Sequence, residues 1–204
     1  FYERREIKDI LAYLRMLVNR KDLVSLKRII NVPPRGIGPK TFDLVKQAIL
    51  DERPETLNEL ALSKAGLKNF LEILETVDKL TEEANILDIM RLIVKLTAYE
   101  QYLKDGTEEG QARFENIQEL FNVATIFQKF PWRDGLEKFL EEVALMTSVD
   151  DFDPDSSKVT LMTLHQAKGL EFDTVFLVGL EEGILPHSRS LLEPKDIAEE
   201  LRRA

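Results

Sequence analysis

A short polar segment, 165–172, carries the residue types in this chain that are best suited to bind a ligand. It reads HQAKGLEF and lies between two β-rich runs, 159–163 and 174–178, in a chain that is otherwise typical of helices. Polar groups at the carboxyl end of a buried strand occupy the position where open α/β sheets bind ligands. If the segment forms one helical turn, His165 and Lys168 share a face, and both side chains favour the binding of an anion. The alternative is an ordinary surface turn.

This segment also resembles a known family. The pattern T-L-H-x-x-K-G-L-E-F, continued by V-F-L-V-G-x-E-E-G-x-x-P-H, is similar to motif V and its continuation in superfamily 1 DNA helicases of the UvrD/PcrA/Rep type. The resemblance implies that Glu171 and Gly169 lie near the nucleotide, at the cleft between two motor domains. The contacts to single-stranded DNA that it implies are Thr163, His165, Lys168 and His187.

A second motif, N-V-P-P-R-G-I-G-P-K-T at 31–41, predicts a glycine hairpin between two helices. The first helix must end before Pro33, because proline lacks an amide and restricts the residue before it. The second can begin at Pro39, a favourable first helical residue. Such a hairpin can present backbone amides, a positive helix end, Arg35 and Lys40 to a DNA phosphate. A plain helix–helix turn is the alternative.

The second motif is similar to the glycine hairpin by which the inserted subdomain of UvrD-type helicases contacts duplex DNA. It is not a P-loop, because the GxxxxGK spacing is absent and no strand precedes it. The duplex-DNA residues that the resemblance implies are Arg35, Gly36, Ile37, Gly38, Lys40 and Thr41.

Composition and charge limit the function classes. With 204 residues, 44% of them hydrophobic, the chain can bury a sizeable core. It has no cysteine and two histidines, which excludes disulfides and thiolate metal sites, and we predict no metal site. The net charge is −9, but residues 1–50 carry eleven Lys or Arg against five Asp or Glu, so a basic quarter could hold phosphate. No apolar run could span a bilayer, so we expect no membrane contact and a cytoplasmic location.

Residues 1–18 predict one amphipathic helix, with apolar side chains on one face and most charges, Asp9 among them, on the other. The opening F-Y-E-R-R-E-I-K-D and the later Y-L-R are similar to the helix that precedes the inserted subdomain of the helicases. The chain starts without Met and inside this helical pattern, which favours a piece of a longer protein.

Residues 51–146 predict helices and short joins only, and one of these helices carries an apolar stripe made of Leu67, Phe70, Leu71, Leu74, Val77 and Leu80. Asn85 is the expected cap of one helix, because its side chain can accept hydrogen bonds from the first free amides. Aromatic side chains at helical spacing indicate a core rather than a surface for stacking bases. Arg113, Glu115 and Asn116 are candidates for a polar network with partners that the sequence does not identify.

We therefore expect a mainly α fold: a helical inserted subdomain with a small α/β remnant of a RecA-like motor domain that carries two short strands. The resemblance places 1–18 and 158–204 in the second motor domain and 19–157 in the inserted all-helical subdomain.

The function implied is that of a piece of an ATP-dependent DNA helicase with 3′ to 5′ polarity. The intact parent would use ATP and Mg²⁺, and the implied partners are single-stranded and duplex DNA, a first motor domain and repair proteins. Phosphoryl transfer needs a P-loop lysine and an arginine directed at the γ-phosphate. The chain has neither, so we predict that it hydrolyses no ATP alone. The alternative is a helical protein-docking or regulatory module.

Overall fold

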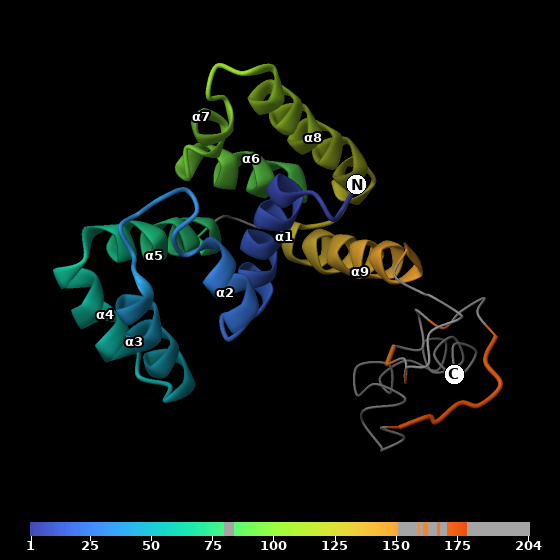
Figure 1. The fold of residues 1–204 in the computed structure, drawn as a ribbon, viewed down its shortest axis with the longest axis horizontal. Coiled ribbons are helices and arrows are strands. Elements are labelled where there is room, and N and C mark those ends of the chain that lie inside the picture. The colour runs from blue at the N-terminus through green and yellow to red at the C-terminus, as the bar shows by residue number, and fades with distance from the viewer. Residues whose placement is uncertain (80–83, 151–158, 160, 163–166, 168–170, 179–204) are drawn as a thin grey trace. The chain divides into compact units, whose positions relative to one another are not determined.

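The computed structural model describes residues 1–79, 84–150, 159, 161–162, 167 and 171–178 (Figure 1). In chain order, its helices are α1 (Arg5–Val18), α2 (Leu23–Ile29), α3 (Pro39–Leu50), α4 (Pro54–Ser63), α5 (Ala65–Asp78), α6 (Ile86–Leu96), α7 (Tyr99–Leu103), α8 (Glu108–Ala124), the 3₁₀ turn η1 (Thr125–Phe127) and α9 (Trp132–Asp150). The predicted mainly α fold is confirmed. Among the residues described, no helix is long and apolar enough to cross a membrane.

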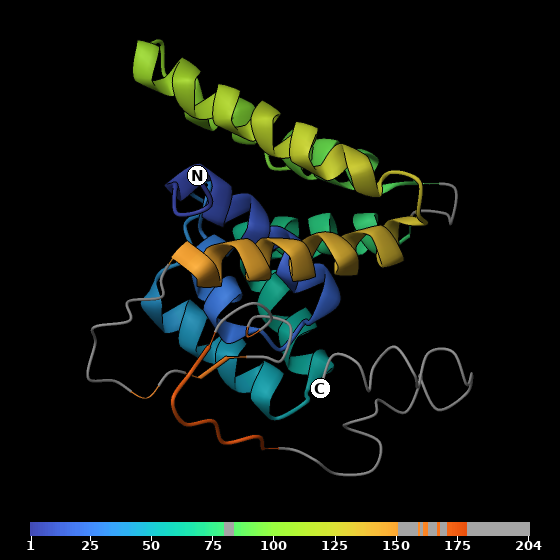
Figure 2. The ribbon, with the colours of Figure 1, turned by 90° about the vertical axis from the view of Figure 1, so that its right-hand side faces the viewer.

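The chain divides into two compact units, residues 1–143 and 144–204. α1 is the central helix of the first unit and packs against α2, α6 and α8 (Figures 1 and 2). It is buried on nearly every side, as a helix at the middle of a core must be. The predicted division at 18/19 and 157/158 stays a prediction, and in the first unit α1 packs together with the helices that follow it.

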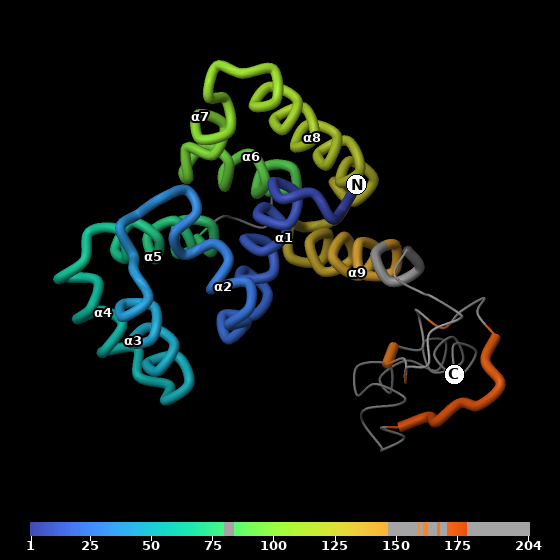
Figure 3. The backbone as a smooth tube through the Cα atoms, viewed as in Figure 1, coloured from blue at the N-terminus to red at the C-terminus, as the bar shows by residue number. Residues whose placement is uncertain are grey.

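Two groups of helices adjoin α1 in the first unit. In the tube view of Figure 3, α3, α4 and α5 form one group, with α4 packed on both of its neighbours. The second group is α6, α7 and α8, which pack on one another. The predicted apolar stripe of α5 is confirmed, since Leu67, Phe70 and Val77 are buried. The largest fully buried side chains include Tyr13, Tyr99, Phe70 and Phe139.

The two predicted strands are not confirmed. Residues 174–178 form no strand, and the described residues of the first run, Val159, Leu161 and Met162, form none either. A strand is stabilised by burying one face and by pairing its backbone with a neighbour, and two strands alone are marginal. Val175, Phe176 and Val178 are exposed, so no apolar burial stabilises a strand there. The RecA-like remnant stays a prediction.

Candidate nucleic-acid interface

The predicted helix, glycine hairpin and helix are confirmed. α2 begins with a side-chain cap, because the Asp22 carboxylate accepts hydrogen bonds from two amides of the first turn. α3 begins at Pro39, whose fixed φ suits the first helical position, and Gly38 precedes it in an extended conformation. We call residues 31–41 the hairpin.

The backbone of the hairpin is held from inside by Asn31. Its side-chain oxygen accepts hydrogen bonds from the amides of Arg35, at 2.7 Å, and Ile37, at 3.1 Å. Between them Gly36 has a φ of +69°, a left-handed conformation that glycine adopts without strain. The Ile37 side chain is buried in the core. Ile37, predicted at the duplex, therefore has both its side chain and its amide engaged within the protein.

Arg35, also predicted at the duplex, directs its guanidinium into the protein. Nη2 donates to the Tyr13 hydroxyl at 2.7 Å, and Nε donates to the Asn69 side chain at 3.4 Å. The group lies over the rings of Tyr13 and Phe70, at 6.0 and 5.6 Å from their centroids. Nη1 donates to the carbonyls that end α2 and follow it, those of Ile29, Ile30, Val32 and Pro33, at 3.1 to 3.4 Å. A cation here balances the negative end of the α2 dipole.

The outer side of the hairpin is open. Gly36 and Gly38 are exposed, and a Cβ added to either would meet nothing within 4 Å. The cap residue of α3, Gly38, has no side chain that could accept hydrogen bonds from its first amides. Among the residues described, the amides of Gly38, Lys40 and Thr41 have no hydrogen-bond partner, and the Lys40 side chain is exposed. Free amides, the positive helix end and a lysine thus occur together, which is an arrangement suited to an anion.

The other predicted DNA and nucleotide residues lie mostly outside the described residues. Those outside are Thr163, His165, Lys168, Gly169 and His187. Glu171 is described, and it is exposed in a segment without regular secondary structure. The single-stranded DNA and nucleotide contacts therefore stay predictions.

A buried carboxylate on α1 joins three helices. Asp9 is 2% exposed and accepts hydrogen bonds from Nε of Arg28, on α2, at 2.7 Å and from the hydroxyl of Tyr99, on α7, at 2.6 Å. Burial and the Asp9 carboxylate both raise the pKa of Tyr99, so this hydroxyl stays protonated and donates. The expectation that Asp9 lies on a solvent face is wrong, because α1 has core on that side as well.

Glu6, one turn earlier on α1, is also buried and holds α8. The Asn116 amide donates to it at 2.6 Å and also accepts from Arg4. The predicted polar network therefore includes Asn116. The other two candidates make local pairs on α8: Arg113 with Glu109, and Glu115 with Gln111.

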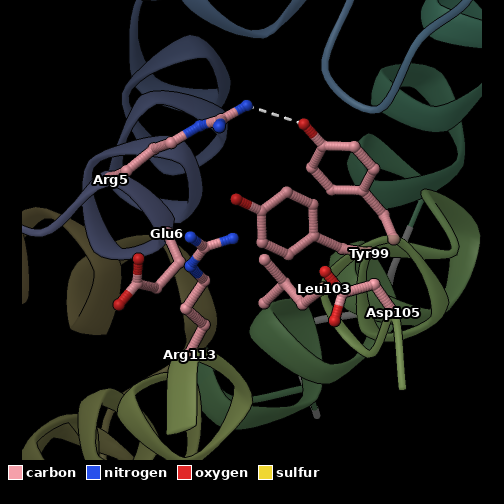
Figure 4. Close-up of a pocket in the computed structure, with 7 residues that line it drawn as sticks. Arg5, Glu6, Tyr99, Leu103, Asp105 and Arg113 are labelled. Atoms are coloured by element: carbon pink, nitrogen blue, oxygen red, sulfur yellow. Dashed lines mark hydrogen bonds between the residues drawn. The ribbon is translucent and has the colours of Figure 1, made fainter. Parts of the chain in front are cut away.

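A polar cavity of about 210 Å³ adjoins Glu6, between α1, α7 and α8 (Figure 4). Arg5 donates to the Tyr102 hydroxyl at 2.7 Å across it, and Arg113 extends into it from α8. Hydrogen bonds from Thr107 lower the pKa of Asp105, so this carboxyl is charged. The lining contains two arginines, Arg5 and Arg113, and two acidic residues, Glu6 and Asp105, so its formal charges cancel and the cavity lacks the excess charge that would recruit an anion.

Sequence reasoning missed the stripe that unites these contacts. Glu6, Asp9 and Tyr13 are spaced by three and four residues, so they share one face of α1. Glu6 bonds to α8, Asp9 bonds to α2 and α7, and Tyr13 bonds to the hairpin. The spacing was visible in the sequence, but nothing in it indicated that this polar face is buried.

Residues 1–204 match the UvrD-like helicase C-terminal domain. The ATP-dependent DNA helicase PcrA of Bacillus subtilis (strain 168) is 38% identical, over 100% of this chain and 30% of that protein. PcrA of Staphylococcus aureus (strain NCTC 8325 / PS 47) is 36% identical, over 96% of this chain and 28% of that protein. DNA helicase II of Haemophilus influenzae is 38% identical, over 100% of this chain and 30% of that protein.

The chain thus spans under a third of the length of the curated relatives it matches. A match over every residue, with helices and a glycine hairpin where the family resemblance predicts them, leads to one conclusion. The chain belongs to the family of UvrD-like helicase C-terminal domains.

Proposed function

We propose that this chain is the DNA-contacting part of an ATP-dependent helicase that moves 3′ to 5′ and unwinds DNA, and that its hairpin binds the phosphate backbone of the duplex. The observation that carries the proposal is the open outer side of the hairpin, where the uncapped amino end of α3 lies beside the exposed Lys40. Amides and a lysine bind the phosphate of any nucleotide, so the hairpin binds duplex DNA independently of its base sequence.

The contact is made by the backbone of Gly36 and Gly38, the first amides of α3 and the side chains of Lys40 and Thr41. Arg35 and Ile37 belong to the hairpin but support it from inside, since the guanidinium of Arg35 and the side chain of Ile37 are both engaged within the protein. With Arg35 engaged inside the protein, Lys40 is the cation of the hairpin that contacts the phosphate. The salt dependence of duplex binding by the hairpin should therefore reflect one cation.

The phosphate contact is tested by exchanging Lys40 for alanine and titrating duplex DNA at several salt concentrations, with fluorescence anisotropy as the readout. Lys40→Ala should lower the slope of log K against log salt by about 0.9 and weaken binding roughly fivefold, which is ~1 kcal/mol. Lys46→Ala is the matched control, an exposed lysine on the same helix but away from its amino end. Equal affinity and slope for both variants and the parent chain would remove the DNA contact from the hairpin.

The motor role rests on groups that this sequence does not contain. No GxxxxGK[ST] segment is present, so we propose that ATP and Mg²⁺ are bound chiefly by a first motor domain, as the names of the relatives suggest for a complete helicase. Glu171 and Gly169 complete the nucleotide site, and Thr163, His165, Lys168 and His187 contact the single strand. The purified chain should show no DNA-stimulated ATP turnover, and turnover by a preparation free of other helicases would contradict this assignment.

A further inference from the structure

Arg35 is the residue of the hairpin whose role the structure changes most. A guanidinium that contacts DNA must have donors free to reach a phosphate, yet each of its three nitrogens already has an acceptor within the protein. Among the described residues, moving the side chain outward would leave the carbonyls of Ile30 and Pro33 without a hydrogen-bond donor. It would also separate the cation from the faces of Tyr13 and Phe70.

Contacts from three directions fix the hairpin backbone. Tyr13, on the central helix α1, accepts from Arg35 and donates to the carbonyl of Val32 at 2.6 Å. Asn31 accepts from the amides of Arg35 and Ile37. On the other side, Gly66 near the start of α5 lies so close that an added Cβ would overlap the Arg35 carbonyl oxygen. The left-handed turn at Gly36 follows from these constraints, and with it the exposure of Gly36, Gly38 and Lys40.

We infer that Tyr13, Asn31 and Arg35 are positioning residues, which hold the hairpin so that its glycines and Lys40 face a duplex, and that Arg35 itself does not contact DNA. The inference rests on the proposed function of the hairpin. Its physical content is pre-organisation: amides that are already fixed lose little conformational entropy when a phosphate binds, whereas a loose loop must be ordered at that moment.

The charge-conserving exchange Arg35→Lys separates the two possible roles of Arg35. Lysine binds a phosphate well as a point charge. It lacks the planar guanidinium whose several N–H donors bond to a tyrosine and four carbonyls together. A positioning role predicts that Arg35→Lys weakens duplex binding about tenfold although the charge is kept. A direct phosphate contact predicts nearly unchanged binding.

Amide hydrogen exchange of the DNA-free chain gives a second readout. Arg35→Lys and Tyr13→Phe should both speed exchange at the Ile37 amide about tenfold, because the turn that joins this amide to the Asn31 oxygen loses hydrogen bonds that fix it. Tyr13→Phe keeps the ring and removes only the hydroxyl, so it tests the network even if Arg35→Lys fails to fold. Tyr99→Phe is the matched control: it removes another buried hydroxyl bonded to α1, but one that does not contact the hairpin. It should leave Ile37 exchange and duplex affinity unchanged.

The outcomes separate the inference from the proposed function. Faster exchange at Ile37, with weaker binding in Arg35→Lys, Tyr13→Phe and Lys40→Ala, supports both. Weaker binding in Lys40→Ala combined with full binding and unchanged exchange in Arg35→Lys and Tyr13→Phe overturns the inference alone. Binding that none of these variants changes overturns the DNA role of the hairpin, and the positioning role with it.

Discussion

Asp9 should be among the most costly side chains to truncate in the first unit. Its carboxylate is 2% exposed and receives two hydrogen bonds, from Arg28 and Tyr99. In Asp9→Ala the Tyr99 hydroxyl, on a residue 1% exposed, loses its acceptor at a cost of ~1–3 kcal/mol. The charge-assisted bond from Arg28 is worth ~1.5–3 kcal/mol, discounted because that side chain is 34% exposed and can turn toward water. Together these give a loss of about 2–5 kcal/mol.

Urea unfolding followed by tryptophan fluorescence measures this loss. Trp132 is the single tryptophan of the chain and is buried in the same unit as Asp9, so the signal reports on that unit. With a slope of roughly 2 kcal/mol per molar urea, the midpoint should fall by about 2 M while the slope itself stays constant. Asp43→Ala is the matched control, an exposed aspartate on α3, and should change the free energy of unfolding by less than ~0.5 kcal/mol.

A double-mutant cycle with Tyr99→Phe isolates the contact between the two residues. In the parent chain Tyr99→Phe should cost ~1.5–3 kcal/mol, because the hydroxyl bonds a charged group. In the Asp9→Ala background the same exchange removes an orphaned hydroxyl, and it should be neutral or stabilising. The coupling energy should therefore be about 1.5–3 kcal/mol. A coupling energy below ~0.5 kcal/mol, or an Asp9→Ala cost below ~1 kcal/mol, would refute the buried network.

Three further measurements test other parts of the fold. Burial raises the pKa of Tyr13 to about 12, so its contribution to stability is complete below pH 10 and is lost between pH 10 and 12. In that window the free energy of unfolding of the parent chain should fall by roughly 1.4 kcal/mol per pH unit, and Tyr13→Phe should remove this fall. Asn85→Ala should cost ~1 kcal/mol in urea unfolding, because Asn85 and Asp88 form a capping box at the start of α6. Gly110→Ala should lower the melting temperature: the new Cβ would lie 2.5 Å from the Leu103 carbonyl oxygen, and this clash of ~1–3 kcal/mol exceeds the helix gain of ~1 kcal/mol.

Much of the helical fold followed from local sequence. The capping of α6 by Asn85 was predicted and is confirmed, because a cap depends on side chains and amides within one turn. The hairpin was predicted for a similar reason, since Pro33 ends one helix and Pro39 starts the next. The apolar stripe of α5 was predicted as core, and Phe70 is 1% exposed.

The direction in which charged side chains point did not follow from local sequence. Arg35 sits in a basic, glycine-rich motif, where sequence reasoning favours a phosphate contact, but the structure gives it carbonyls and two aromatic rings within the protein. Asp9 lies on the face of α1 that periodicity assigns to solvent, yet it is buried, and so is Glu6 one turn earlier. Such side chains turn inward because partners distant in sequence satisfy them, and Asn116 is 110 residues from Glu6.

The sequence by itself determined the helices, the cap of α6, the hairpin and the family, because these depend on spacing and on neighbours a few residues away. The tertiary structure decided which cation of the hairpin faces outward and which polar groups hold the core. That choice depends on Tyr13 from α1 and Gly66 from α5, residues that meet the hairpin only when the chain has folded. Buried polar groups must find their partners across such distances, and no local pattern encodes the pairing.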